Sequence, residues 1–277
     1  MWELQFLGVG PGKPVPDRNH ASIILQRQSA TGREVILLDT GEPCARELLK
    51  AGISYKEIST ICISHGHSDH IGGLPMVLQG IWIEKRSTPL PVYLPKELIL
   101  PLKNWLEAVY LPPDLLGFPL NFLAWEDHPK ISVPGGTVEV FQTTHLNNLK
   151  KEFHAEVSGA NRFLAYGMDL CGEWGRIIYS GDIGAPEDLA GVLTSPTDIL
   201  ICEMAHFSPE ALFGFLRDKP VKKLLLTHTT SDAYLNQASV LKLGKELTQE
   251  KIHIEFAEEG RSTDVHDLSR AKDFQNG

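Results

Sequence analysis

Several features that would place a chain in a special class are missing from these 277 residues. No apolar run reaches the roughly 18–20 residues needed to span a bilayer. The first residues, MWELQFLGVGPG, lack a basic start followed by a long apolar stretch, so no secretory signal is expected. No internal repeat or low-complexity tract is present. We therefore predict a cytoplasmic protein without a membrane segment.

Cysteine is scarce and unpaired in the sequence. Cys44, Cys62, Cys171 and Cys202 are far apart, and no CxxC pair occurs. This spacing argues against a disulfide framework and against a thiolate zinc site. We expect reduced, buried side chains at all four positions.

An excess of positive charge is also missing. The chain has 26 Lys and Arg against 35 Asp and Glu, a formal net charge of −9. Such a charge repels a long polyanion at a distance, which counts against general nucleic-acid binding. A local basic patch for one specific RNA stays possible, because net charge does not fix the field at a single cleft.

The remaining composition is that of a folded globular protein, with 42% hydrophobic and 22% charged residues. A chain of this length can bury a full core, and we predict one domain over residues 1–277. Short apolar runs typical of strands alternate with helical patterns, which indicates an α/β fold. The expected strands are Ser22–Leu25, Glu34–Leu38, Ile58–Ile63, Val138–Phe141, Phe163–Tyr166, Arg176–Tyr179, Asp198–Cys202, Lys223–Leu226 and Ile252–Phe256. The expected helices are Ala45–Lys50, Leu74–Glu84, Pro209–Arg217 and Ser239–Gln249, the third capped by Ser208.

Residues 90–119 differ from the rest of the chain because leucine and proline dominate them. We interpret them as an insertion into the domain. Plain packing on the domain, a lid and a homodimer contact are the three alternatives for this segment.

The densest group of chemically active side chains is SHGHSDHIGG, directly after the expected strand Ile58–Ile63. It places His65, His67, Asp69 and His70 within six residues. In an extended stretch alternate side chains point the same way, so His65 and His67 can converge on one ion. The following turn would present Asp69 and His70 to a second ion. Imidazole and carboxylate ligands suit zinc, with manganese or iron as alternatives.

This HxHxDH pattern resembles the signature of the metallo-β-lactamase superfamily. The remaining signature positions of the family occur in order: His145 after Gln142-Thr143-Thr144, Asp182 after Tyr179-Ser180-Gly181, and His228 after Thr227. The resemblance implies an αββα sandwich, in which two β-sheets are flanked by helices. It also implies two divalent metal ions, the first bound by His65, His67 and His145, and the second by Asp69, His70 and His228, with Asp182 bridging them.

The resemblance extends to the surroundings of the ions. Asp39, in Leu37-Leu38-Asp39-Thr40-Gly41, matches a family position behind the metals, although a simple turn-forming aspartate is the alternative. A pair of divalent ions lowers the pKa of a shared water and neutralises charge on the electrophile. Asp69 would orient that water or accept its proton.

Two further segments resemble the ribonuclease Z branch of the superfamily. Phe6-Leu7-Gly8-Val9-Gly10 followed by Arg18-Asn19 resembles its glycine turn and Arg-Asn pair, which would border the site; a first hairpin with turn residues is the alternative. His206 lies 22 residues before His228 and resembles a catalytic histidine of that branch. It would assist the scissile phosphate or the leaving oxygen, oriented by Glu203. Otherwise it is a helix-start residue that faces solvent.

The chain departs from ribonuclease Z in two places. That branch inserts a long arm that grips tRNA between the positions of His145 and Asp182, whereas only 36 residues separate them here and none resembles such an arm. After His228 the chain reads Thr229-Thr230-Ser231-Asp232, where the branch has Phe-Ser and a downstream Arg-Tyr.

We therefore predict a metal-dependent phosphodiesterase whose substrate is a small phosphoester, such as a cyclic nucleotide, rather than tRNA. The alternatives are a tRNA 3′-end endonuclease and another ester or lactone hydrolase of the superfamily. A noncatalytic metal-binding sensor is the alternative from a different class. All seven expected ligand positions hold competent residues, which argues against it.

Overall fold

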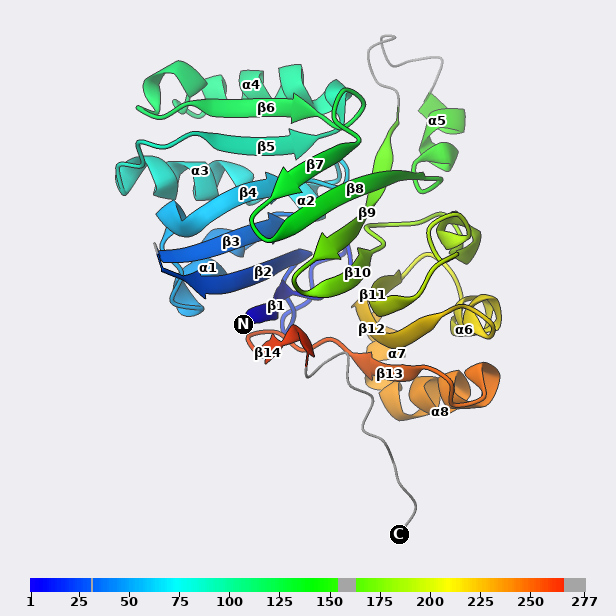
Figure 1. Ribbon diagram of the computed structural model, residues 1–277. Coiled ribbons are helices and arrows are strands. Elements are labelled where there is room, and N and C mark those ends of the chain that lie inside the picture. The colour runs from blue at the N-terminus through cyan, green and yellow to red at the C-terminus, as the bar shows by residue number, and fades with distance from the viewer. Residues whose placement is uncertain (31, 154–162, 267–277) are drawn as a thin grey trace.

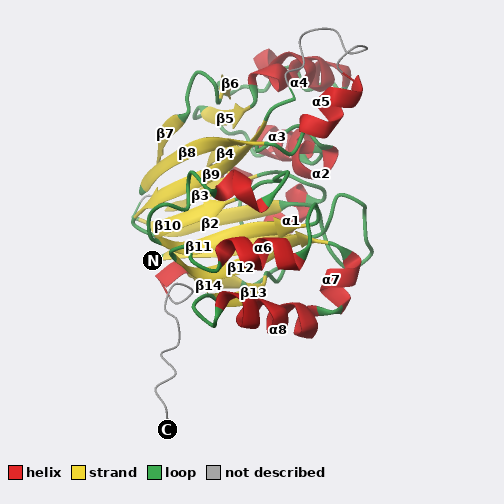
Figure 2. Cartoon of the chain, turned by 90° about the vertical axis from the view of Figure 1, so that its right-hand side faces the viewer, coloured by secondary structure: helices red, strands yellow, loops and turns green. Residues whose placement is uncertain are grey.

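Two β-sheets lie face to face in the computed structural model, which describes residues 1–30, 32–153 and 163–266 (Figure 1). Each sheet has seven strands. The first has the order β14-β1-β2-β3-β4-β5-β6 and the second the order β13-β12-β11-β10-β9-β8-β7. Helices cover the outer face of each sheet, as the turned view in Figure 2 also shows. The predicted α/β class and αββα sandwich are confirmed.

The first sheet is built mainly from the N-terminal half. Its strands are β1 (Trp2–Gly8), β2 (Ser22–Ser29), β3 (Gly32–Leu38), β4 (Ile58–Cys62), β5 (Leu90–Leu94), β6 (Leu120–Ala124) and β14 (Ser262–Asp264). Strands β3 to β6 run parallel, and β14, β1, β2 and β3 pair in antiparallel fashion. Its helices are α1 (Cys44–Lys50), α2 (Ser68–Ile71), α3 (Leu74–Ile83) and α4 (Lys96–Ala108), with the short 3-10 helices η1 (Tyr55–Glu57) and η2 (Pro113–Leu115).

The second sheet contains β7 (Lys130–Val133), β8 (Gly136–Thr143), β9 (Ala165–Gly172), β10 (Gly175–Tyr179), β11 (Thr197–Met204), β12 (Val221–Thr229) and β13 (His253–Phe256). Strands β10 to β13 run parallel, and β7 to β10 pair in antiparallel fashion. The helices of this half are α5 (Asn147–Phe153), η3 (Pro186–Leu189), α6 (Pro209–Leu216), α7 (Ser231–Leu235) and α8 (Gln237–Thr248).

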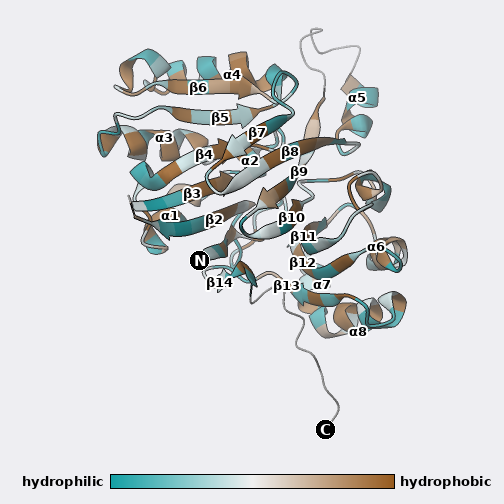
Figure 3. Cartoon of the chain, viewed as in Figure 1, coloured by the Kyte–Doolittle hydropathy of each residue, from teal (hydrophilic) through white to brown (hydrophobic). Residues whose placement is uncertain are grey.

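The hydrophobic core follows these layers. One buried cluster joins α1, α3 and α4 to the outer face of the first sheet, a second fills the space between the sheets, and a third joins α6 and α8 to the second sheet. Alternation along β2 shows the division: Ile24 belongs to the outer cluster, whereas Ile23 and Leu25 face the other sheet. In Figure 3 strands and helices both carry hydrophobic colour, and helices such as α4 alternate between brown and teal.

Some details differ from the sequence predictions. Cys44, Cys62 and Cys202 are buried, but Cys171 is exposed, so the prediction of four buried thiols is wrong at that position. The strand expected from Phe163 begins at Ala165, because Phe163 has a φ of 56°. Helices α3, α6 and α8 end at Ile83, Leu216 and Thr248, one residue earlier than predicted in each case.

Residues 90–119 contribute β5 and α4 to the first sheet and its helical layer. Leu90, Val92 and Leu94 alternate into the outer core cluster, and Leu102 and Leu106 of α4 join it. The proline-rich composition therefore accompanies a strand that pairs with both β4 and β6. No helix among the described residues is long and apolar enough to cross a membrane.

Candidate metal centre

The seven predicted ligands meet at one edge of the sandwich. His65, His67, Asp69 and His70 follow β4, and His145 and Asp182 follow β8 and β10. His228 is the penultimate residue of β12. Strands that run in the same direction bring their carboxyl ends to one edge of a sheet, which is where open α/β sheets carry their sites. Both sheets therefore contribute to the group.

A first cluster combines three histidines with one oxygen of Asp182. The Nε2 of His145 lies 3.1 Å from the Nδ1 of His67 and 3.6 Å from the Oδ2 of Asp182. The Nε2 of His65 lies 3.9 Å from the same oxygen. Ligand atoms about 2.1 Å from a tetrahedral ion lie about 3.4 Å from one another. The four side chains are therefore spaced to surround one ion.

A second cluster uses the other oxygen of Asp182. Its Oδ1 lies 3.3 Å from the Nε2 of His70 and 3.8 Å from the Nδ1 of His228. The Oδ2 of Asp69 completes the group, 3.0 Å from the Nε2 of His228 and 3.4 Å from the Nε2 of His70. Asp182 thus presents one oxygen to each cluster, which is the arrangement of a bridging carboxylate.

The unpaired atoms of the site fit cations. The Nε2 of His65, the Nε2 of His70, the Oδ1 of Asp182 and the Nδ1 of His228 are buried without a hydrogen-bond partner. The short distance between His70 and Asp182 does not have the angle of a hydrogen bond. Buried polar atoms are almost always satisfied, so four orphans in one group indicate an absent partner. A divalent ion on each side of Asp182 would satisfy them.

The charge of the site leads to the same conclusion. Asp39, Asp69, Asp182 and Glu203 are all buried. Within the described part of the chain, their ion-pair partners are histidines, and no Lys or Arg nitrogen lies within 4.0 Å of any of them. Buried carboxylates require a compensating charge. The donor set therefore suits divalent cations.

The pKa values of the imidazoles separate into two groups. Burial lowers the pKa of His145 to about 4, and it also lowers the pKa values of His65 and His67. These rings are neutral, the form in which imidazole binds a metal. Burial also disfavours the charged forms of His70 and His228, but neighbouring carboxylates, Asp182 foremost, outweigh it and raise both pKa values. Without an ion, protons thus supply part of the charge that the second cluster requires.

Asp39 supports the site from behind, as the family position implies. Its carboxylate accepts hydrogen bonds from the backbone N–H and hydroxyl of Ser64, the Tyr179 hydroxyl and the Nδ1 of His70. In the neutral ring, the form that binds a metal, the bond to Nδ1 leaves the Nε2 of His70 with its lone pair directed to the second cluster. The Nδ1 of His65 makes the corresponding contact with the Ser64 hydroxyl. These hydrogen bonds thus leave the Nε2 of His65 and the Nε2 of His70 as the nitrogens that face the metal sites.

His206 lies beside both clusters and is held by Glu203. The Nδ1 of His206 lies 2.8 Å from the Oε1 of Glu203, and Glu203 also accepts the backbone N–H groups of Ile183 and Ala205. The His206 ring is 4.5 Å from the ring of His145 and 5.9 Å from that of His228, centroid to centroid. Its side chain is 36% exposed, so it can reach a substrate at the rim. The hydrogen bond to Glu203 outweighs burial and raises the pKa of His206.

Two contributors to the site, Asp188 and His20, were not predicted from the sequence. The Oδ2 of Asp188, in η3, accepts the backbone N–H of Thr144 and of Gly184, and so ties the loop of His145 to that of Asp182. The second is His20, whose Nε2 is buried without a partner; burial lowers the pKa of this ring and the charge of Asp69 only partly opposes the shift. Neither belongs to a motif, so only the fold reveals them.

The loop between β1 and β2 borders the second cluster, in agreement with the expectation for the Arg18-Asn19 segment. A Cβ atom built on Gly12 would lie 3.2 Å from the Oδ2 of Asp69. The backbone of this loop therefore passes directly beside a predicted ligand.

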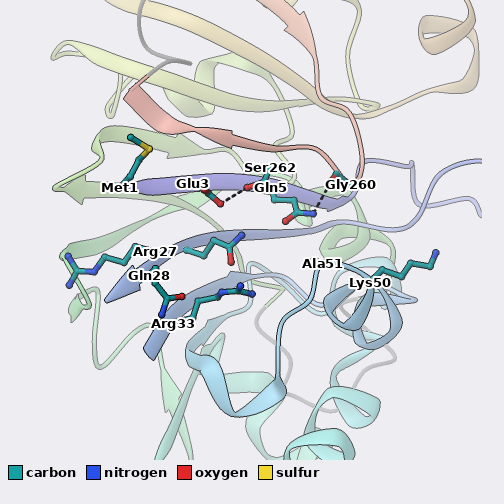
Figure 4. A pocket seen from close by; sticks show the side chains of 11 residues that line it. Met1, Glu3, Gln5, Arg27, Gln28, Arg33, Lys50, Ala51, Gly260 and Ser262 are labelled. Carbon is teal, nitrogen blue, oxygen red and sulfur yellow. Dashed lines mark hydrogen bonds between the residues drawn. The ribbon is translucent and has the colours of Figure 1, made fainter. Parts of the chain in front are cut away.

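A polar groove of about 500 Å³ lies elsewhere, on the outer face of the first sheet around β1 and β2 (Figure 4). Within it, Ser262 donates to Glu3 and Gln5 donates to the Gly260 carbonyl. None of the seven predicted ligands lines this groove. The candidate site is therefore defined by its donor atoms and not by this cavity.

Comparisons with known proteins agree with this geometry. The family described as "Anti-Pycsar protein Apyc1" matches residues 2–228. Ribonuclease Z of Pyrococcus abyssi is 41% identical over 113 residues, which cover 41% of this chain and 36% of that protein. Ribonuclease Z of Methanococcus maripaludis is 38% identical over 119 residues, 43% of this chain and 36% of that protein. The match thus spans about a third of the length of these curated relatives.

Solved structures share the whole fold. The metallo-β-lactamase fold protein YhfI of Bacillus subtilis superposes with a TM-score of 0.73 at 16% identity, covering 95% of this chain and 98% of that one. The short form of human tRNase Z superposes with a TM-score of 0.66 at 19% identity, covering 95% and 99%. The chain has the metallo-β-lactamase fold, and its relatives are hydrolases of that superfamily.

Proposed function

This chain belongs to the Anti-Pycsar protein Apyc1 family, and from that premise we propose that it is a binuclear metal-dependent phosphodiesterase acting on a small phosphoester, such as a cyclic nucleotide. One observation carries the proposal. The two oxygens of Asp182 face two separate groups of buried nitrogen and oxygen atoms, four of which have no hydrogen-bond partner.

In this proposal His65, His67 and His145 hold one ion, Asp69, His70 and His228 hold the other, and Asp182 contacts both. Zinc fits the imidazole-rich donor set, with manganese or iron as alternatives. When bound, such a pair supplies Lewis-acid chemistry that activates water and stabilises charge on a phosphoryl group.

His206, Glu203 and Asp69 perform the proton chemistry. Glu203 accepts from the Nδ1 side of His206, which leaves the Nε2 of that ring to donate to a substrate oxygen. The raised pKa of His206 keeps this proton available near neutral pH, so the ring can protonate the leaving oxygen. Asp69 orients the attacking water through its carboxylate, or accepts a proton from it.

The net charge of the chain and the short segment between His145 and Asp182 both favour a small substrate over tRNA. The chain carries a net charge of −9, and 36 residues separate His145 from Asp182. The identity with ribonuclease Z over 113 residues favours the alternative, a tRNA 3′-end endonuclease. Hydrolysis of a lactone or another ester, and a noncatalytic metal sensor, are the remaining candidates.

A substrate panel distinguishes these functions. Protein loaded with zinc or manganese is assayed with bis(p-nitrophenyl) phosphate, a 3′,5′-cyclic mononucleotide, a lactone, a thioester and precursor tRNA, with Asp182→Ala as the inactive control. We expect metal-dependent turnover of the phosphodiesters that Asp182→Ala abolishes. Turnover of the lactone or thioester alone, or of precursor tRNA alone, would overturn the proposal, as would binding of metal without turnover of any substrate.

We also propose that the chain forms a homodimer through α4 and the residues that follow it. Leu100, Trp105 and Val109 of this segment expose apolar surface, and Tyr110 and Leu115 are 90% and 73% exposed. Large exposed apolar side chains in one segment are typical of an interface. Light scattering should give twice the 30.7 kDa chain mass. Tyr110→Ser combined with Leu115→Ser should give the monomer, and a wild-type monomer would contradict the proposal.

A further inference from the structure

Arg18 is buried in an unusual way. Only 6% of the residue is exposed, yet the carboxylate nearest its guanidinium is that of Asp17, at 4.0 Å and largely exposed. Its Nε is buried without a hydrogen-bond partner. Burying a cation costs free energy, and among the described residues no buried carboxylate offsets that cost for Arg18. Other contacts must therefore hold this side chain in place.

The partners of Arg18 lie at the end of β12. Its Nη1 donates to the carbonyl oxygen of Thr229, at 3.1 Å, and to the Thr229 hydroxyl, at 3.2 Å. The Tyr234 ring of α7 covers the guanidinium, with 4.0 Å between the Cζ of Arg18 and the ring centroid. The arginine therefore connects the loop after β1 to β12, which contains His228, and to α7, which follows β12.

His228 itself has a strained backbone. Its φ is 46°, in the left-handed region that residues other than glycine rarely adopt. The pairing of β11 with β12 shifts at this point, from Glu203 opposite Thr227 to Met204 opposite Thr229. His228 is thus the extra residue of a β-bulge, and bulges redirect a side chain. Here the redirected ring lies against Asp69 and Asp182.

The loop that carries Arg18 is fixed from its other side. The Glu259 carboxylate accepts the backbone N–H groups of Val9 and Asn19 and the side-chain amide of Asn19. A Cβ on Gly10 would lie 3.2 Å from the Cβ of Arg18 and 2.8 Å from the Asn19 carbonyl oxygen, so the loop also packs closely on itself. The loop therefore fixes the position of Arg18, and through its hydrogen bonds Arg18 fixes the position of Thr229.

We infer that Arg18 is a positioning residue for the second metal ion: by holding Thr229, it maintains the bulge that directs His228 into the cluster of Asp69, His70 and Asp182. Strain of this kind persists only where the surroundings impose it. Arg18 supplies two hydrogen bonds to the next residue, Thr229, and stacks on the Tyr234 ring of α7. The inference rests on the proposed binding of two ions.

The test separates the second ion from the first and from general stability. Arg18→Gln, Arg18→Lys and wild type are titrated with zinc by calorimetry, and bound zinc is counted after dialysis. The control is Arg86→Gln, because Arg86 is likewise buried and donates to backbone carbonyls, but at the start of β4. Thr229→Val provides a milder change that removes only the hydroxyl acceptor.

We expect Arg18→Gln to bind the second zinc 10–100-fold more weakly, the usual effect of losing an outer support of a ligand. The first zinc should bind as in wild type. Arg18→Lys, which retains a donor, should recover part of the affinity, and Thr229→Val should lose less than Arg18→Gln. Arg86→Gln should lower thermal stability without changing either affinity.

Two results would overturn the inference while leaving the proposed function intact: two unchanged affinities in Arg18→Gln, or equal weakening of both ions. If Arg86→Gln weakened binding of the second zinc by the same factor as Arg18→Gln, the inference would also be overturned, because the loss of affinity would then follow from lower stability alone. A wild-type protein that binds no zinc or manganese would overturn both proposals.

Discussion

Asp39 shows how one residue serves the backbone and the site together. It has a φ of 56°, the left-handed conformation that aspartate tolerates in turns, and its carboxylate accepts from Ser64, Tyr179 and His70. The sequence left a turn aspartate and a metal-supporting aspartate as alternatives, and the residue is both. The choice could not be made from the sequence, because Tyr179 lies 140 residues away along the chain.

Motif order was sufficient to find the seven ligand candidates, because the segments that carry them lie at or just after the ends of strands β4, β8, β10 and β12. Arg18 was found through the same resemblance, but its partner Thr229 was not. Contacts between loops that are distant in the sequence leave no local periodicity, so they cannot be predicted from a single sequence. His20 and Asp188 were missed for the same reason.

Replacement of His206 tests its proposed role as the proton donor. His206→Asn should lower kcat roughly 10²–10⁴-fold, the usual size of a general acid–base contribution. Its metal content should not change. In wild type kcat should fall as pH rises through the raised pKa of His206, because the ring then loses the proton it donates, and this limb should be absent in the variant.

His253→Asn is the matched control, because His253 also contacts a glutamate, Glu255, but lies on β13 and is 44% exposed. It should retain wild-type kcat and the wild-type pH profile. An equal loss of kcat in both variants would contradict a specific role of His206.

The pKa of His145 predicts how acid destabilises the metal-free protein. The ring titrates at 6.5 when unfolded, and burial lowers its pKa to about 4 in the fold. Between these values the unfolded chain binds a proton that the folded protein does not, so the free energy of unfolding falls as pH drops from 6.5 to 4. This ring contributes at most about 3 kcal/mol.

Urea midpoints of chelator-treated protein at pH 7 and pH 4.5 measure the effect. His70 and His228, whose pKa values are raised, contribute with the opposite sign, so the comparison must be made between wild type and His145→Gln. The variant should lose less stability on acidification. Equal losses in the two proteins would refute the assignment to His145.

At the level of elements, the sequence was sufficient to predict strands with strongly apolar runs, but it did not show which strands pair with one another. The expected core strands appear in the structure because runs such as Leu224 to Leu226 are buried on both faces. Strand β5 escaped prediction because Pro91 interrupts its pattern, although β4 and β6 both pair with it. The parallel neighbours of β5 come from other parts of the sequence, so the hydrogen bonds with which they stabilise β5 cannot be predicted from the residues of β5 alone.

The turn that follows β3 is packed tightly against the second cluster. A Cβ on Gly41 would lie 2.1 Å from the backbone oxygen of Asp69 and 2.7 Å from the Cβ of His20. Gly41→Ala should therefore displace Asp69, destabilise the protein by about 1–3 kcal/mol and weaken the second ion. Thermal melting and zinc titration provide the two measurements.

Gly66→Ala, in the His65–His70 motif after β4, is the comparison. There a Cβ would meet the Cδ2 of Leu98 at 2.6 Å, and the end of a leucine side chain can rotate away. We expect Gly66→Ala to lose less stability than Gly41→Ala and to keep the wild-type affinity for the second ion. If Gly66→Ala weakened the second ion more than Gly41→Ala, the packing argument would be wrong.

For the molecule as a whole, the decisive feature is that the ligands come from both sheets. His65 to His70 follow β4 of the first sheet, whereas His145, Asp182 and His228 belong to the second. Bound ions would therefore connect the two halves of the sandwich. Because an unfolded chain lacks this arrangement, their binding energy adds to the free energy of unfolding.

Metal removal should accordingly lower the melting temperature of the entire protein. A site filled at 1,000 times its Kd contributes about 4 kcal/mol, which corresponds to roughly 10 °C for a domain of this size. Calorimetry with zinc and with EDTA should show one transition that moves as a unit. Asp182→Ala removes the residue shared by both clusters, so its melting temperature should respond little to EDTA. A transition that splits on chelation would instead mean that the two sheets unfold independently and that the ions do not connect them.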